Sequence, residues 1–186
     1  MAYNIRIKTA CFLAFLLSMA SCTKDIDFTQ GEDLEVYPVM ETSLVYFKGS
    51  VPDLLENGIS DTGLLVDEVV LEAFNNEFFV ENVTRADVVL ELTNSINRNF
   101  SILVQCLNDT DQIQHQFSFS VAASPDNLPI TTTHTEIFEG ATLNALKRTT
   151  KLVLTLQMEA GDPLNQSSLG SIALRSKGIF YLTIEG

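Results

Sequence analysis

The stretch FSILVQCLNDTDQIQHQFSFSV (residues 100–121) decides the fold, because apolar and polar residues alternate in it with a period of two. Its first part, 100–106, predicts a strand with Phe100 and every second residue after it on one buried face. The turn formers NDTD follow at 108–111. In 112–121 the polar face consists of Gln and Ser, and the opposite face carries Ile113, His115, Phe117, Phe119 and Val121. The stretch therefore predicts a β-hairpin.

The same alternation recurs along the rest of the chain. With the hairpin it predicts about eight strands, the others lying at 36–47, 64–71, 85–92, 131–138, 151–158 and 172–184. Gly178, inside the last of these, indicates a bulge or bend. Residues 140–148 break the pattern, and the spacing of their leucines predicts a short helix. Pro, Asn or Gly in the remaining segments predicts loops at 53–63, 124–129 and 161–170.

These elements together predict an all-β domain over residues 36–186. Antiparallel strands with one polar and one apolar face bury the apolar faces best when two sheets pack together. We therefore expect an immunoglobulin-like antiparallel β-sandwich of about eight strands with one short helix near 140–148. The Cys, Trp and Cys pattern of true immunoglobulin domains is absent, because the chain contains no Trp.

The N-terminal segment has the features of an export signal. Arg6 and Lys8 precede the apolar run ACFLAFLL at 10–17, as in the n-region and h-region of a signal peptide. Even when extended to residue 20, the run is shorter than the ~20 apolar residues that a membrane-spanning helix needs, so no transmembrane helix is expected in the mature chain. Two small residues, Ala20 and Ser21, then stand directly before Cys22.

The motif Met19-Ala20-Ser21-Cys22 resembles the lipobox of bacterial lipoproteins, with Met19 where leucine is usual. This resemblance implies diacylglyceryl transfer to the Cys22 sulfur, cleavage before Cys22 and acylation of the new amino terminus. Residues 1–21 are then a lipoprotein signal peptide, and the two or three acyl chains hold the protein stably on a membrane. An ordinary secretory signal that happens to end near a cysteine is the alternative.

Residues 22–35 are predicted to form an acidic, flexible tether. Lys24, Asp25 and Asp27 resemble the surface-export signal of Bacteroidota lipoproteins, which implies an outer-membrane lipoprotein displayed at the cell surface. A periplasm-facing lipoprotein is the alternative. At ~3.3–3.6 Å per residue, this tether spans at most ~50 Å, which is enough to clear a membrane surface.

Charge and cysteine usage narrow the possible partners. The formal net charge is −13, and it becomes −15 when Arg6 and Lys8 leave with residues 1–21. Such an acidic chain repels phosphate backbones, so we expect no nucleic-acid partner. Of the three cysteines, only Cys106 remains unmodified in the mature chain, and its place in a strand predicts that it is buried.

The sequence contains few candidates for catalysis or metal binding. Its two histidines, His115 and His134, fall in separate predicted strands, the first on the core face and the second among exposed residues. There is no Gly-x-Ser-x-Gly motif, and one free cysteine with two histidines makes no usual zinc ligand set without carboxylates placed by the fold. The acidic stretch 25–33 has Gln30 where a calcium-binding EF-hand requires Gly. We therefore expect no catalytic residues, metal or cofactor.

These observations predict a non-enzymatic binding or structural module. The alternative is a hydrolase-type enzyme whose carboxylate-based site is assembled only in the fold, and two acids converging in a deep pocket would favour it. The ligand, protein or glycan, stays open. Glycan sites stack sugar rings on aromatic faces, and Tyr37, Tyr46 and Tyr181 have positions that could face outward.

Most of the mature chain, over segments 22–47, 82–121 and 131–143, resembles small Bacteroidota (flavobacterial) surface lipoproteins of unassigned function. The resemblance implies location at the cell surface. It supplies no catalytic or ligand-binding residues that could be carried over to this chain.

Overall fold

The computed structural model describes residues 35–56, 64–71 and 76–185. The signal peptide, the lipobox residues Met19, Ala20 and Ser21, the lipidation site Cys22 and the export residues Lys24, Asp25 and Asp27 lie outside the described residues. Their assignments therefore stay predictions. The described strands that form the sandwich all lie within one compact unit, Glu35–Ile184.

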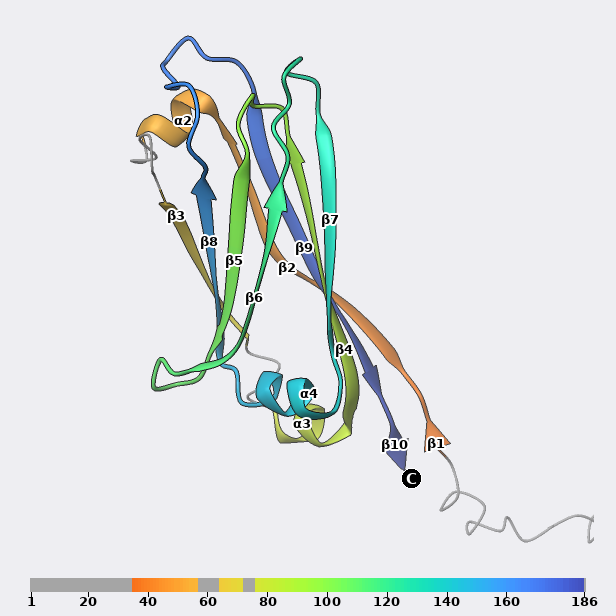
Figure 1. Cartoon of the computed structure of the whole chain (residues 1–186). Coiled ribbons are helices and arrows are strands. Elements are labelled where there is room, and N and C mark those ends of the chain that lie inside the picture. Colours follow the sequence, from red (N-terminus) through yellow and green to blue (C-terminus); the bar gives the residue numbers. More distant parts are fainter. Residues whose placement is uncertain (1–34, 57–63, 72–75, 186) are drawn as a thin grey trace, which may run out of the picture. The chain divides into compact units, whose positions relative to one another are not determined.

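Two four-stranded antiparallel sheets make up the domain, and they pack face to face (Figure 1). The first has the order β2-β9-β4-β7, with β2 at Val39–Ser50, β9 at Ser171–Leu182, β4 at Val83–Asn94 and β7 at Ile130–Phe138. The second has the order β3-β8-β5-β6, with β3 at Leu64–Val70, β8 at Lys151–Met158, β5 at Phe100–Leu107 and β6 at Ile113–Val121. Two more strands, β1 (Glu35–Val36) and β10 (Ile184–Glu185), have two residues each.

The expected all-β sandwich of about eight antiparallel strands is confirmed, and each predicted strand is found close to its predicted range. The order of the strands is that of a jelly roll, in which most connections cross from one sheet to the other. The immunoglobulin-like label needs correction in this respect. Alternation fixes which face of a strand is buried, but it carries no information on which distant strand becomes its neighbour.

The core lies between the two sheets and follows the predicted alternation. In β5, every second residue from Phe100 to Cys106 is buried. The inward residues of β8 and β9 are buried in the same way. β6 differs from these strands, and its Phe117 and Phe119 are only half-buried. The reason is that β6 is the edge strand of its sheet and pairs with a neighbour on one side alone.

Gly178 does not mark a bulge, contrary to the prediction. It stays in register with both neighbouring strands, opposite Thr42 and Val88. A Cβ atom at this position would lie 2.7 Å from the Phe180 ring, so only glycine leaves enough space for the ring there. The bulge of this region lies in β2, between Ser43 and Tyr46.

Three short helices join the strands in the part of the chain that the structure describes. α4 (Gly140–Leu146) confirms the helix predicted near 140–148. α2 (Val51–Glu56) occupies the start of a segment predicted as a loop, where Asp53 accepts hydrogen bonds from the backbone and side chain of Ser50. α3 (Glu77–Asn82) was not predicted; it buries Phe79 and begins at Asn76, whose side chain accepts from the Phe79 N–H. α2 and α3 have six residues each, fewer than two turns, which is too short for an apolar period to be recognised in the sequence.

Candidate functional site

The outer face of the sheet β2-β9-β4-β7 carries the richest set of polar side chains that we find among the described residues. Outward positions on these strands alternate with the buried ones, so each strand contributes every second side chain. The register places Glu91 of β4 opposite Arg175 of β9, and Asp87 opposite Ile179. Two distinct arrangements occur on this face: a closed polar network and an open groove.

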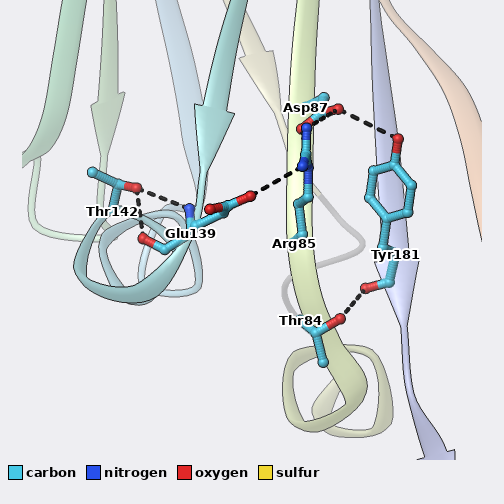
Figure 2. Close-up of polar contacts among 6 residues, drawn as sticks. All are labelled: Thr84, Arg85, Asp87, Glu139, Thr142 and Tyr181. Atoms are coloured by element: carbon cyan, nitrogen blue, oxygen red, sulfur yellow. Dashed lines mark hydrogen bonds and ion pairs between the residues drawn. The ribbon is translucent and has the colours of Figure 1, made fainter.

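The closed network joins β4 and β9 to the start of α4, as Figure 2 shows. Arg85 makes a two-pronged contact with Asp87, Nε to Oδ1 at 2.8 Å and an Nη atom to Oδ2 at 3.0 Å. The other Nη atom lies 3.1 Å from the carboxylate of Glu139, and the guanidinium stands 5.3 Å from the ring centre of Tyr181. The Tyr181 hydroxyl donates to Asp87 at 3.4 Å.

This network satisfies its own members. The Asp87 side chain is only 10% exposed, and its charge is balanced by Arg85. The hydrogen bond to Asp87, together with the nearby carboxylates, raises the pKa of the Arg85 guanidinium. Glu139 and Thr142 bond reciprocally around the first turn of α4 (Figure 2). Because these groups already have partners, we interpret the network as a structural link.

The open groove runs across β2, β9 and β4. It consists of two adjoining shallow hollows of about 260 and 310 Å³, and both are lined by Glu91 and Arg175. Tyr46 and Lys48 of β2 line the first hollow. Glu41 and Lys177 line the second and form an ion pair at 2.9 Å.

Several groups in the groove are unengaged. Within the described residues, Arg175, Glu91 and Lys48 form no hydrogen bond or ion pair through their side chains, and Tyr46 is 66% exposed. Tyr37 is also exposed, and Tyr181 is half-buried in the network, so the outward direction expected for the three tyrosines is confirmed. An exposed ring beside an unpaired guanidinium and an unpaired carboxylate can bind a polar ligand by stacking and by charge-assisted hydrogen bonds.

The two histidines meet in a seam between the sheets. His115 of β6 and His134 of β7 bond to the two oxygens of Glu136, at 2.7 and 3.2 Å. His134 is half-buried and stacks on Phe119 at 4.8 Å between ring centroids, so its expected exposure is wrong. The reason is the register of β7 with β4. His134 lies opposite the buried Leu90, so its side chain points toward the other sheet. No group of acidic, His and Cys residues in the described ranges is arranged to hold a metal ion.

Cys106 lies beside this seam, opposite His115. Burial, with a smaller contribution from the Glu136 charge, raises the pKa of its thiol to about 12. The thiolate form that a nucleophile requires is therefore absent near neutral pH. The seam is a packing feature of the fold.

Comparison with known proteins adds little beyond the architecture. No protein-family model and no curated protein sequence matches the chain. A protein of Parabacteroides distasonis described as secreted matches over 64% of this chain and 38% of its own, with 14% identity and a TM-score of 0.48. The tailspike protein 4 of bacteriophage CBA120 matches over 80% and 19%, with 9% identity and a TM-score of 0.40. The VP2 subviral particle of infectious bursal disease virus matches over 80% of this chain and 38% of its own, with 11% identity and a TM-score of 0.38.

The chain spans less than two fifths of the length of each of these three structures. At such identities and scores, the likenesses carry no argument about activity. Among the described residues, no helix is both long enough and apolar enough to cross a membrane. The site must therefore be interpreted from its own chemistry.

The groove was not anticipated from the sequence. Alternation did indicate that Glu91 and Arg175 point outward, because their neighbours in β4 and β9 are core residues. What it could not show is that β2, β9 and β4 lie side by side. No local pattern encodes that arrangement.

Proposed function

We propose that this chain is a lipid-anchored, surface-displayed lipoprotein that acts as a non-enzymatic binding module, with the groove across β2, β9 and β4 as its ligand-binding surface. The observation that carries the proposal is the set of unengaged groups in the groove: Arg175, Glu91, Lys48 and the exposed ring of Tyr46. A guanidinium or a carboxylate can form hydrogen bonds to two adjacent hydroxyl groups of a sugar, and an exposed aromatic ring can pack against the face of the sugar ring. A glycan is therefore the ligand class that we favour.

The anchor part of the proposal rests on the lipobox resemblance of Met19 to Cys22 and on the acidic tether that follows. Two or three acyl chains suffice for stable attachment, so the sandwich itself needs no membrane-binding face. Lys24, Asp25 and Asp27 support display at the outer surface, where the groove would meet external ligands.

The alternative of a carboxylate-based hydrolase receives less support. Glu41 and Glu91 do line the same hollow, but Glu41 is ion-paired with Lys177. A hydrolase of this kind needs two acids that converge on one bond, in a pocket that admits the reacting water but shields the bond from bulk solvent. The groove is shallow and lies on an open sheet face, so we do not propose an enzymatic activity.

We expect Arg175→Ala and Glu91→Ala each to weaken glycan binding by ~10-fold or more, because a hydrogen bond to a charged group contributes about 1.5–3 kcal/mol. The measurement is binding of the purified chain to an array of immobilised glycans. Gln157→Ala, an exposed substitution on the other sheet, serves as the matched control and should bind like the parent chain. If the two groove variants bind as the control does, the groove is not the ligand site.

Cys22→Ser should release the protein from membranes. The serine oxygen does not replace the thiol in diacylglyceryl transfer, so the variant lacks the acyl chains that hold it. Partitioning between detergent and aqueous phases measures this directly: we expect the parent chain in the detergent phase and the variant in the aqueous phase. Equal aqueous partitioning of both forms would contradict the lipoprotein assignment and leave the groove proposal intact.

A further inference from the structure

The strands β6 and β7 lie at the same side of the sandwich, each as the last strand of its sheet (Figure 1). Their outward side chains are uncharged. On β7 these are Thr131, Thr133, Thr135 and Ile137, and on β6 they are Gln114, Gln116, Ser118 and Ser120. The opposite side is different, since β2 contains Glu41 and Lys48 and β3 contains Asp67 and Glu68.

This difference matters because an edge strand exposes backbone groups that can pair with another chain. Proteins usually prevent such pairing with charged residues, proline or a bulge at the edge. β2 has both charges and a bulge. Neither β6 nor β7 contains proline, and the register of β7 with β4 runs unbroken from Phe138 to Ile130. The register of β6 with β5 shifts only at its beginning, opposite Cys106 and Leu107. Glu136, which β7 directs toward the other sheet, is bonded to His115 and His134. The side formed by β6 and β7 is thus open to strand pairing.

The two edges are also aligned with each other. Each strand has nine residues, and the middle ones are Phe117 in β6 and His134 in β7. The rings of these two residues stack, with centroids 5.2 Å apart and an interplanar angle of 20°. The His134 ring also stacks on Phe119, at 4.8 Å and 7°, so the middle of β7 faces β6 between Phe117 and Phe119. A line that passes through both sheets at this point therefore crosses both edge strands close to their midpoints.

We propose that a second copy of this chain docks on this side, with β6 pairing to β6 and β7 to β7 around one two-fold axis along that line. Rotation about such an axis makes each new strand pair antiparallel. Thr133 then faces Thr135 of the partner subunit, and Ser118 lies next to Ser118 of the partner subunit. Both four-stranded sheets continue into the second copy.

Charge favours a second copy as the occupant of this side. The chain carries a net charge of −13, so two copies repel each other wherever their acidic surfaces meet. The outward faces of β6 and β7 carry no such charge, and their Thr, Ser and Gln side chains are self-complementary hydrogen-bonding groups. A two-fold interface requires this self-complementarity.

Cross-linking of the full chain in intact cells tests the proposal. Thr135→Cys places an exposed thiol close to the axis, and a short bifunctional maleimide reagent should then give a band of twice the chain's mass. Ser43→Cys, at the opposite edge of the same sheet, should give no such band beyond the background of the parent chain. Cys106 contributes little background, because it is buried.

A charge introduced on the other edge strand tests the geometry. Ser118→Glu, combined with Thr135→Cys, brings two like charges together across the axis and should reduce the cross-linked fraction at least ~10-fold. Gln166→Glu, an exposed change in the β8–β9 loop, adds the same charge elsewhere and should leave the fraction unchanged. Equal thermal unfolding of the two Glu variants shows that both are folded.

Two results would overturn the proposal. One is a Thr135→Cys chain that cross-links no more than the Ser43→Cys chain. The other is a cross-link that persists in folded Ser118→Glu, because pairing through β7 alone does not bring the β6 strands together. Neither result depends on whether the groove binds a glycan.

Discussion

Replacing Phe100 with alanine is expected to lower the free energy of unfolding by about 3–5 kcal/mol, the range for deleting a fully buried aromatic side chain. Phe100 is 0% exposed and belongs to β5, an inner strand of its sheet. It lies opposite Met158 on one side and Val121 on the other. The surrounding strands cannot collapse into the cavity without breaking their own register. Urea denaturation followed by circular dichroism measures the loss.

Phe119→Ala is the matched control, because Phe119 has the same chemistry on the neighbouring edge strand. It is half-buried and covered on one side by His134, so its truncation removes less buried area and leaves a site that solvent can enter. We therefore expect a clearly smaller loss than for Phe100. Equal losses would show that β6 is packed as tightly as β5, contrary to the exposures described above.

The second large effect is expected for Gly170→Ala, which should lower the free energy of unfolding by about 2–6 kcal/mol, the sum of backbone strain and overpacking. Gly170 has φ of +108°, a conformation that L side chains rarely adopt. An added Cβ would lie 2.3 Å from the Ser95 carbonyl oxygen and 2.9 Å from the Ile96 Cα, and both of these are backbone atoms. The buried side chain of Asn94 accepts a hydrogen bond from the Ile96 N–H and so holds this stretch of backbone in place. Because the added Cβ would clash with backbone atoms, a change of side-chain rotamer cannot relieve the clash.

Gly140→Ala separates the two causes of this effect, which are the positive φ of the glycine and the clash of the added Cβ with the backbone. Gly140 also has a positive φ, +51°, but no atom lies within 4 Å of its added Cβ. We expect a loss of about 1 kcal/mol from backbone strain alone. Thermal unfolding of the two variants, measured side by side, should show the larger shift for Gly170→Ala. Similar shifts would mean that the contact with Ser95 relaxes at little cost.

Much of the fold could be predicted from the sequence, because a period of two directly reports which side of a strand is buried. The hairpin at 100–121, the two apolar faces of β8 and β9 and the helix near 140 were all identifiable from local residues. The depth of burial could not be predicted in this way. Phe117 lies on the predicted inward face, but it is only half-buried because β6 is an edge strand. Whether a strand is central or peripheral depends on pairing across the whole chain.

The candidate site was less predictable than the fold. Glu91 and Arg175 lie on strands far apart in the sequence, and they became groove residues only because β4 and β9 pair. His134 gained a partner from β6 in the same way. The proposed lipobox, in contrast, is a linear motif, so its residues could be identified in the sequence without any reference to the fold.

The pairing of β2 with β9 has a consequence for the order of events in the cell. The Val45 N–H bonds to the Ser176 hydroxyl across 131 positions of the chain, so the first sheet cannot close until nearly all of the protein has been made. At ~5–20 residues per second, translation of that interval takes roughly 7–26 s. During this time the domain lacks a central strand of that sheet, and the N-terminal segment has emerged on a chain that is still unfolded. If residues 1–21 act as the proposed signal peptide, a translocation pore that accepts only unfolded polypeptide has time to engage them before the sandwich forms.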